Sequence, residues 1–177
     1  MTPEHRLIRD AVRLVPDFPT AGILFRDLSP ILEGASLFRQ TINLLAAECD
    51  DIQPEKIVAL DARGFIFGSA LAYKLGLGFV QVRKKGKLPS LTISHAYQLE
   101  YGSAEFEMHC DSIRPGERVV IVDDVLATGG TAGAALHLLR RLGAQVLRML
   151  FVVELEALHG RGQLTPASVR ALISYKD

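Results

Sequence analysis

The chain has 177 residues, 49% of them apolar, and its 20 basic side chains are matched by 20 acidic ones. This length suits one domain with a sizeable core, and zero net charge argues against a nucleic acid or a membrane surface as partner, because both attract an excess of Lys and Arg. No apolar run approaches a membrane span and the N-terminus lacks a targeting signal, so we expect a cytoplasmic protein whose two cysteines stay reduced, with a disulfide as the alternative.

The first part of the chain is predicted to hold two helices. One begins at Thr2-Pro3, with Thr2 as N-cap and Pro3 in the first helical position, and its apolar face reaches Val15 before Pro16 ends it. An irregular segment then runs to Pro30. The second helix is expected over about Ser36–Cys49.

Strands and helices alternate in the rest of the chain. Helices are predicted over Phe65–Leu75 and in the apolar-periodic segment that ends at Gly143. The predicted strands are Ile57–Leu60, Phe79–Arg83, Val119–Val122, Val146–Val153 and Val169–Ser174. This order predicts a single α/β domain, 1–177, with a mainly parallel sheet flanked by helices on both faces.

A hairpin and a cluster of polar segments complete the expected fold. Residues 97–101 and 104–109 are predicted to pair after an irregular basic stretch. Ligands bind beyond the carboxyl ends of parallel strands. The segments placed there are Asp61–Gly64, Arg83–Pro89, Asp123–Thr131 and Glu154–Leu155.

The stretch VVIVDDVLATGGT, residues 119–131, carries the clearest chemistry. A buried strand leads to two acids, and a loop of small residues then opens a helix. Backbone N–H groups and hydroxyls at a helix N-terminus attract a phosphate, while Asp123 and Asp124 suit a sugar diol or hydrated Mg²⁺. The alternative is a plain turn in which Asp124 or Thr128 caps the helix.

This stretch resembles the phosphoribosyl-diphosphate (PRPP) signature of type I phosphoribosyltransferases. The resemblance implies that Asp123 and Asp124 hold the ribose hydroxyls and that Mg²⁺, carried by PRPP, reaches these acids through water. It also implies that the loop wraps the 5′-phosphate. The loop residues are Ala127, Thr128, Gly129, Gly130 and Thr131.

Asp61–Gly68 offers a second anion site, because Arg63 stands at the start of a predicted helix. Two anion sites at one sheet edge fit PRPP, which has phosphate at both ends. The alternative is an exposed arginine beside glycines that serve packing. The resemblance implies the pyrophosphate loop, which often contains a non-proline cis peptide.

The run Arg83–Lys87 places four cations in five residues. Such a run is either a solvated face or the start of a mobile lid. The resemblance implies that Arg83, Lys84 and Lys87 reach the pyrophosphate, in part across a homodimer interface. It also implies a flexible catalytic loop over residues 84–105.

Two further segments resemble the adenine phosphoribosyltransferase branch of that family: LEYG, residues 99–102, and the FPTxGxxFRDxSP pattern that begins at Phe18. Alone, Glu100 could be an exposed hairpin residue and the aromatics could fill core. The resemblance implies that residues 1–34 form a base-binding hood and that Glu100 is the general acid or base. Adenine would be held by Leu24, Phe25, Arg26 and Leu155.

The implied activity is the conversion of adenine and PRPP to AMP and pyrophosphate with Mg²⁺, in purine salvage, by a homodimer. Two alternatives share the signature. One is an enzyme for another base, such as xanthine or orotate, and the other is a PRPP-sensing regulator on the same fold.

Overall fold

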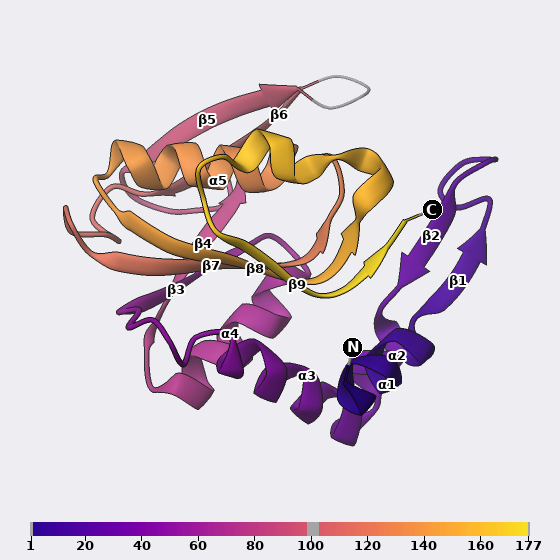
Figure 1. Cartoon of the computed structure of the whole chain (residues 1–177). Helices are drawn as coiled ribbons and strands as arrows, with labels where there is room; N and C mark the ends of the chain where they lie inside the picture. Colours follow the sequence, from indigo (N-terminus) through magenta and orange to yellow (C-terminus); the bar gives the residue numbers. More distant parts are fainter. Residues whose placement is uncertain (1, 99–102, 177) are drawn as a thin grey trace. The chain divides into compact units, whose positions relative to one another are not determined.

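The computed structural model describes residues 2–98 and 103–176. The chain divides into two compact units, one up to Leu44 and one from Leu45 onward. The first unit includes the whole region expected as a hood, and the second contains the seven-stranded sheet (Figure 1).

The N-terminal unit holds a strand pair that the sequence analysis did not predict. Helix α1 (Pro3–Ala11) begins where expected, although the Thr2 hydroxyl bonds to the His5 ring at 2.8 Å and caps no backbone N–H. The helix ends well before Val15, and β1 (Arg13–Pro16) pairs antiparallel with β2 (Leu24–Asp27). The prediction of a longer helix followed by irregular chain was therefore wrong.

Local chemistry explains this hairpin. Pro16 disfavours the helical conformation for the residue before it. Asp17, at φ 56°, accepts a hydrogen bond from the Gly22 N–H at 2.7 Å and so closes the turn between the strands. The short helix α2 (Ser29–Glu33) follows, and α3 (Ala35–Ala47) then matches the second predicted helix.

The second unit is built on a seven-stranded sheet in the order β5-β6-β4-β3-β7-β8-β9. The predicted strands are all present and parallel to one another. Their bounds are β3 (Lys56–Leu60), β4 (Gly78–Lys84), β7 (Arg118–Leu126), β8 (Gln145–Leu155) and β9 (Val169–Tyr175). The expected α/β fold with a mainly parallel sheet is confirmed.

Helices α4 (Gly64–Leu75) and α5 (Gly130–Arg141) cover opposite faces of this sheet (Figure 1). The core under α5 contains Val119 and Ile121 of β7 and Phe151 of β8, all fully buried. A strand buried on both faces reads as a continuous apolar run, which is why these strands were predictable. The packing holds the carboxyl ends of β3, β4, β7 and β8 at one edge of the sheet.

The remaining two strands form an antiparallel hairpin, β5 (Thr92–Gln98) and β6 (Ser103–His109), paired to β4 through β6. The hairpin was expected, although residues 99–102, which hold most of its first predicted strand, lie outside the described residues. Strand β5 begins earlier than predicted, so the segment after Pro89 that was expected to be irregular is largely a strand. Side chains dock it onto α5: the rings of His95 and His137 stack at 3.9 Å, and Arg141 Nη1 donates to the Ser94 carbonyl at 3.0 Å. The expected mobility of residues 84–105 stays a prediction.

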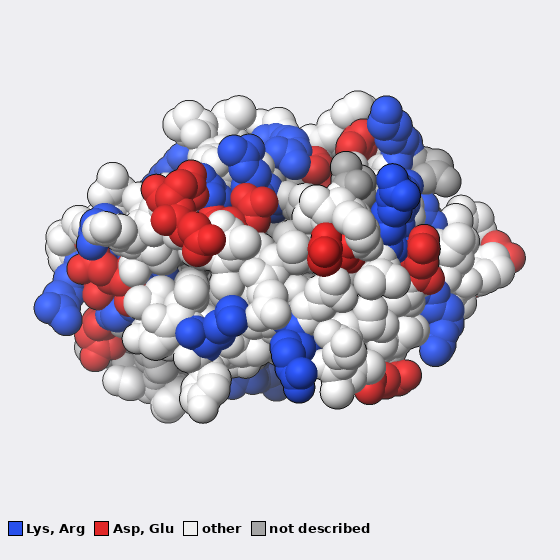
Figure 2. Space-filling view, turned by 60° about the horizontal axis from the view of Figure 1, so that its bottom comes forward, with Lys and Arg blue, Asp and Glu red and all other residues white. Residues whose placement is uncertain are grey.

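Charges of both signs are interspersed over the face shown in Figure 2. This agrees with the balanced count of basic and acidic residues. Within the described residues, every helix falls short of the length and hydropathy that crossing a bilayer requires.

Candidate active site

The loop after β7 has the geometry of an anion site. Strand β7 runs past the two acids to Leu126, a short loop follows, and α5 begins at Gly130. Gly129 has φ 87°, a left-handed conformation that favours glycine and turns the chain into the helix. The first N–H groups of a helix have no carbonyl partner within the helix. A pocket of about 50 Å³ lies here, lined by Asp123, Val125, Leu126 and residues 127–132.

The two acids beside this pocket are nearly buried. Asp123 is 9% exposed and Asp124 5% exposed, and the Asp124 N–H donates to Asp123 Oδ1 at 2.9 Å. Burial raises the pKa of Asp123 well above its usual value, and the neighbouring Asp124 charge raises it further. A ligand that donates hydroxyl hydrogen bonds, or a cation, would therefore stabilise the ionised pair.

The loop after β3 meets these acids directly. Its Asp61–Ala62 peptide is cis, as the resemblance implied. Arg63 forms an ion pair with Asp124. A Cβ on Gly64 would lie 2.7 Å from Asp123 Oδ1 and 3.1 Å from the Val122 carbonyl oxygen, so only glycine fits at the start of α4. The two predicted anion sites thus share the acid pair.

The basic run is joined to the same edge through Arg83. Its Nε donates to Asp61 Oδ2 at 3.4 Å, and its Nη1 donates to the Lys87 carbonyl at 3.1 Å. Lys84 ends β4, and the side chains of Lys84 and Lys87 are exposed. Lys85 pairs with Glu105 at 2.7 Å.

Glu107, which the sequence analysis did not single out, shapes this basic loop from β6. Its Oε1 accepts hydrogen bonds from the Lys87 and Leu88 N–H groups, both at 2.8 Å. Burial alone would raise the pKa of Glu107, but backbone N–H groups of Leu88, Gly86 and Lys87 outweigh it and lower that pKa. Only the position of Glu107 in a strand opposite the loop reveals this role, and that pairing is not visible in one sequence.

The predicted base-binding residues lie on both units. Leu24, Phe25 and Arg26 belong to β2, where the rings of Phe18 and Phe25 meet edge to face at 5.1 Å. Leu24 is 44% exposed, whereas the Arg26 side chain is buried. Leu155 ends β8 in the second unit and is half-buried. Glu100, the predicted acid–base residue, lies outside the described residues.

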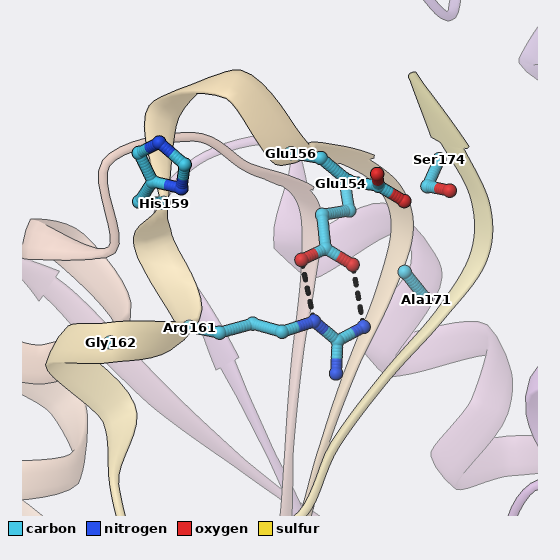
Figure 3. Close-up of a pocket in the computed structure, with 7 residues that line it drawn as sticks. All are labelled: Glu154, Glu156, His159, Arg161, Gly162, Ala171 and Ser174. Carbon is cyan, nitrogen blue, oxygen red and sulfur yellow. Dashed lines mark hydrogen bonds and ion pairs between the residues drawn. The ribbon is translucent and has the colours of Figure 1, made fainter. Parts of the chain in front are cut away.

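A pocket of about 560 Å³ opens beside the end of β8 (Figure 3). Arg161 reaches from the 3₁₀ turn η2 (Gly160–Leu164) to Glu154, and its Nε and Nη2 donate to the two carboxylate oxygens at 2.5 Å each. The hydrogen bond to Glu154 raises the pKa of Arg161. Sequence reasoning placed Glu154 at this edge but missed Arg161, which lies in a turn segment without periodicity.

Oxygen ligands for a cation are available at this edge. Asp123 and Asp124 are hard carboxylate donors, which Mg²⁺ prefers, and Mg²⁺ is commonly bound by one or two carboxylates together with substrate phosphates. In residues 2–98 and 103–176 no group of three or more His, Cys, Asp or Glu side chains is placed to hold a metal ion.

Comparisons with known proteins agree on one family. A family model described as "Phosphoribosyl transferase domain" matches residues 30–168. The adenine phosphoribosyltransferase of Carboxydothermus hydrogenoformans is 56% identical over 161 residues, which cover 91% of this chain and 95% of that protein. The Mus musculus enzyme of the same name is 49% identical over 176 residues and covers 98% of both chains.

Solved structures show the same likeness. The crystal structure of adenine phosphoribosyltransferase from Thermoanaerobacter pseudethanolicus superposes with a TM-score of 0.94 at 46% identity, over 97% of this chain and 99% of the other. The Saccharomyces cerevisiae enzyme, complexed with adenine and an imino-altritol bisphosphate, also gives 0.94, at 41% identity and with the same coverage.

Proposed function

Since the chain belongs to the adenine phosphoribosyltransferase family and catalyses that family's reaction in purine salvage, we propose that the loops at the carboxyl edge of its sheet are the site of the reaction. Adenine and PRPP give AMP and pyrophosphate. The observation that carries the proposal is the meeting of both anion loops at one acid pair: Arg63 pairs with Asp124, and Gly64 leaves room for Asp123.

The phosphate loop, Ala127–Thr131, anchors the 5′-phosphate of PRPP. The N-terminus of α5 directs N–H groups and the positive end of the helix dipole at this point, and the Thr128 and Thr131 hydroxyls add donors. Gly129 and Gly130 let the backbone approach the phosphate closely. Binding energy gained at this end of the substrate holds the reacting carbon in position.

The acid pair serves the sugar. When the C1′–O bond breaks, positive charge develops on the ribose ring, and the carboxylates of Asp123 and Asp124 stabilise it. They also accept hydrogen bonds from the 2′- and 3′-hydroxyls. These contacts would offset the unfavourable burial that raises the pKa of Asp123.

Pyrophosphate leaves toward the second anion loop and the basic run. Arg63 and Arg83 stand at this edge through their pairs with Asp124 and Asp61. Lys84 and Lys87 are exposed cations beside them. Asp123 and Asp124 would help to hold Mg²⁺ with the substrate, and the ion would supply further neutralisation of the leaving group's charge.

Leu24, Phe25 and Arg26 of the first unit and Leu155 of the second keep the adenine-binding roles that the resemblance implies. The S. cerevisiae relative, 41% identical, has been crystallised with adenine, which supports a base site in this chain as well. We assign Glu100 the proton transfer near N7 while N9 attacks C1′. The relatives reported above are all adenine phosphoribosyltransferases, so the xanthine, orotate and regulator alternatives are set aside.

We further propose a cytoplasmic homodimer. Cys49 and Cys110 are unpaired thiols, which suits a reducing compartment. The exposed cations Lys84, Lys85 and Lys87 fit the family pattern in which this run lies near the neighbouring subunit's site.

Thr128→Val tests the assignment of the phosphate loop, because it removes one exposed hydroxyl and keeps the size of the side chain. A hydrogen bond to a charged group contributes about 1.5–3 kcal/mol, so affinity for AMP and ribose 5-phosphate should fall by roughly tenfold or more. Pyrophosphate and adenine lack the 5′-phosphate and should bind as before in calorimetric titrations. Unchanged AMP affinity would remove Thr128 from the site.

A further inference from the structure

The ion pair between Glu154 and Arg161, drawn in Figure 3, belongs to a larger set of hydrogen bonds that holds η2 against the sheet. Besides its two bonds to Glu154, Arg161 donates Nη1 to the Val169 carbonyl at 2.8 Å, so one guanidinium ties η2 to both β8 and β9. Glu154 is 5% exposed. At the other end of η2, Leu164 is fully buried in the core beneath α5. The turn is therefore anchored at both ends.

Gly160, the residue before Arg161, lies against the phosphate loop. A Cβ on Gly160 would overlap the Ala127 carbonyl oxygen and would lie 3.0 Å from the Gly129 nitrogen. In the other direction, a Cβ on Gly129 would overlap the Gly160 carbonyl oxygen and would lie 3.1 Å from the Gly160 carbonyl carbon. Two glycines thus bring the backbone of η2 into direct contact with the backbone of the phosphate loop.

We propose that Glu154 and Arg161 are positioning residues for the 5′-phosphate of the substrate. Their ion pair fixes the position of Gly160, and the Gly160 backbone supports the Ala127–Gly129 backbone by direct contact. Neither side chain touches the phosphate in this scheme. The proposal deepens the function above and rests on the phosphate loop binding the 5′-phosphate.

The physical reason is geometric. Backbone N–H groups hold a phosphate only if each points at an oxygen. In an active site, misplacement of a group by about 1 Å can lower the reaction rate on the order of a hundredfold, and we expect phosphate affinity to depend on position in the same way. Close-packed interiors transmit a displacement of one segment to its neighbour. Loss of one member of the pair would also leave the other charge poorly compensated, which releases η2 from the sheet.

Two variants test the proposal by different routes. Arg161→Gln removes the ion pair and leaves Gly160 intact, whereas Gly160→Ala keeps the ion pair and pushes a Cβ into the loop. Matched controls are Arg170→Gln, which removes the exposed Arg170–Glu48 pair at 3.6 Å, and Gly162→Ala, whose added Cβ meets nothing within 4 Å. Calorimetry would give the dissociation constants of AMP, ribose 5-phosphate, pyrophosphate and adenine, well below each variant's melting temperature.

Both test variants should lose about tenfold or more in affinity for AMP and ribose 5-phosphate, while pyrophosphate and adenine bind within about twofold of wild type and the controls bind all four normally. Arg161→Lys should fall between, since an ammonium cannot form the two-pronged contact. A merely structural role would lower the melting temperature without this selectivity.

Equal losses for all four ligands, or wild-type AMP affinity in Arg161→Gln, would overturn the proposal. If Gly160→Ala does not fold, Arg161→Gln and Arg161→Lys carry the same comparison. Thr128→Val distinguishes the assignment of the phosphate loop from the positioning role of Arg161. If Thr128→Val weakens AMP binding but Arg161→Gln does not, the positioning role is wrong and the assignment of the phosphate loop is kept. If Thr128→Val and Gly160→Ala both leave AMP affinity unchanged, the loop assignment itself fails.

Discussion

Asp123 shows how one residue can be costly for stability and needed for function. Its carboxyl is nearly buried, and burial together with the Asp124 charge raises its pKa in the folded protein above the value of an unfolded chain. The folded state therefore binds this proton more tightly than the unfolded state does. Stability from this group is present at acid pH and is lost as the pH rises from the ordinary Asp value through the raised folded value.

Asp123→Asn should therefore raise the melting temperature of the ligand-free protein at neutral pH. The amide removes the charge, and its oxygen can keep the hydrogen bond from the Asp124 N–H. The gain should shrink as the pH is lowered, because wild-type Asp123 then becomes protonated in the folded state. Melting curves from pH 4 to 8 test this, with the exposed Asp111→Asn as control. A variant that is less stable than wild type at pH 8 would contradict the inference that burial of the Asp123 charge destabilises the folded protein.

At the scale of elements, two helix glycines make opposite predictions. In α4, a Cβ on Gly68 would lie 2.5 Å from the Ala59 Cβ of β3, so Gly68→Ala should push the helix off the sheet and destabilise the protein by about 1–3 kcal/mol. In α5, a Cβ on Gly133 meets its nearest atom, Leu164 Cδ2, at 3.9 Å, and Gly133→Ala should stabilise by up to about 1 kcal/mol.

Urea unfolding of the two variants measures both effects, and each is the other's control for a glycine-to-alanine change in a helix. A stable Gly68→Ala variant would mean that α4 and β3 do not pack as closely as described. A destabilised Gly133→Ala variant would show that Leu164 Cδ2 of η2 lies closer to the added Cβ than the 3.9 Å given above.

The elements that sequence predicted well are those with a strong period and clear ends. Strands β3, β7 and β8 read as apolar runs because helices cover both faces, and Gly143, at φ 78°, marks the end after α5. Convergence of the site followed from topology, since parallel strands end at one edge. The Arg63–Asp124 contact is a consequence of that placement.

The missed elements lack such signals. The β1–β2 hairpin has four-residue strands and a turn closed by the Asp17 side chain. Neither an alternating hydrophobic pattern nor a Gly-containing turn dipeptide therefore predicts it. The first half of β5 was hidden by its polar composition. Gly160 and Arg161 sit in a 3₁₀ turn whose path depends on tertiary contacts with Glu154 and Ala127. No local pattern contains those partners.

At the scale of the whole molecule, we expect two copies of the chain to associate. The motivation is the exposed basic run, which in the family lies near the site of the neighbouring subunit, and a symmetric pair would bury one such surface twice. Sedimentation velocity should give twice the chain mass of 19.4 kDa at assay concentrations. A fully active species sedimenting at the mass of one chain would rule out a site shared between subunits.

If the acid pair and the phosphate loop form the PRPP site, replacing both carboxylates should abolish useful turnover. The rate of pyrophosphate release from PRPP and adenine should be compared between wild type and Asp123→Asn/Asp124→Asn, with circular dichroism to confirm the fold. Removal of one group that stabilises transition-state charge typically costs about 10²–10³ in rate. We therefore predict that the double variant loses a factor of at least about 10³ in the rate of pyrophosphate release and keeps its fold. A folded double variant that keeps its PRPP affinity, its Mg²⁺ dependence and its turnover would show that the acid pair is not part of the PRPP site.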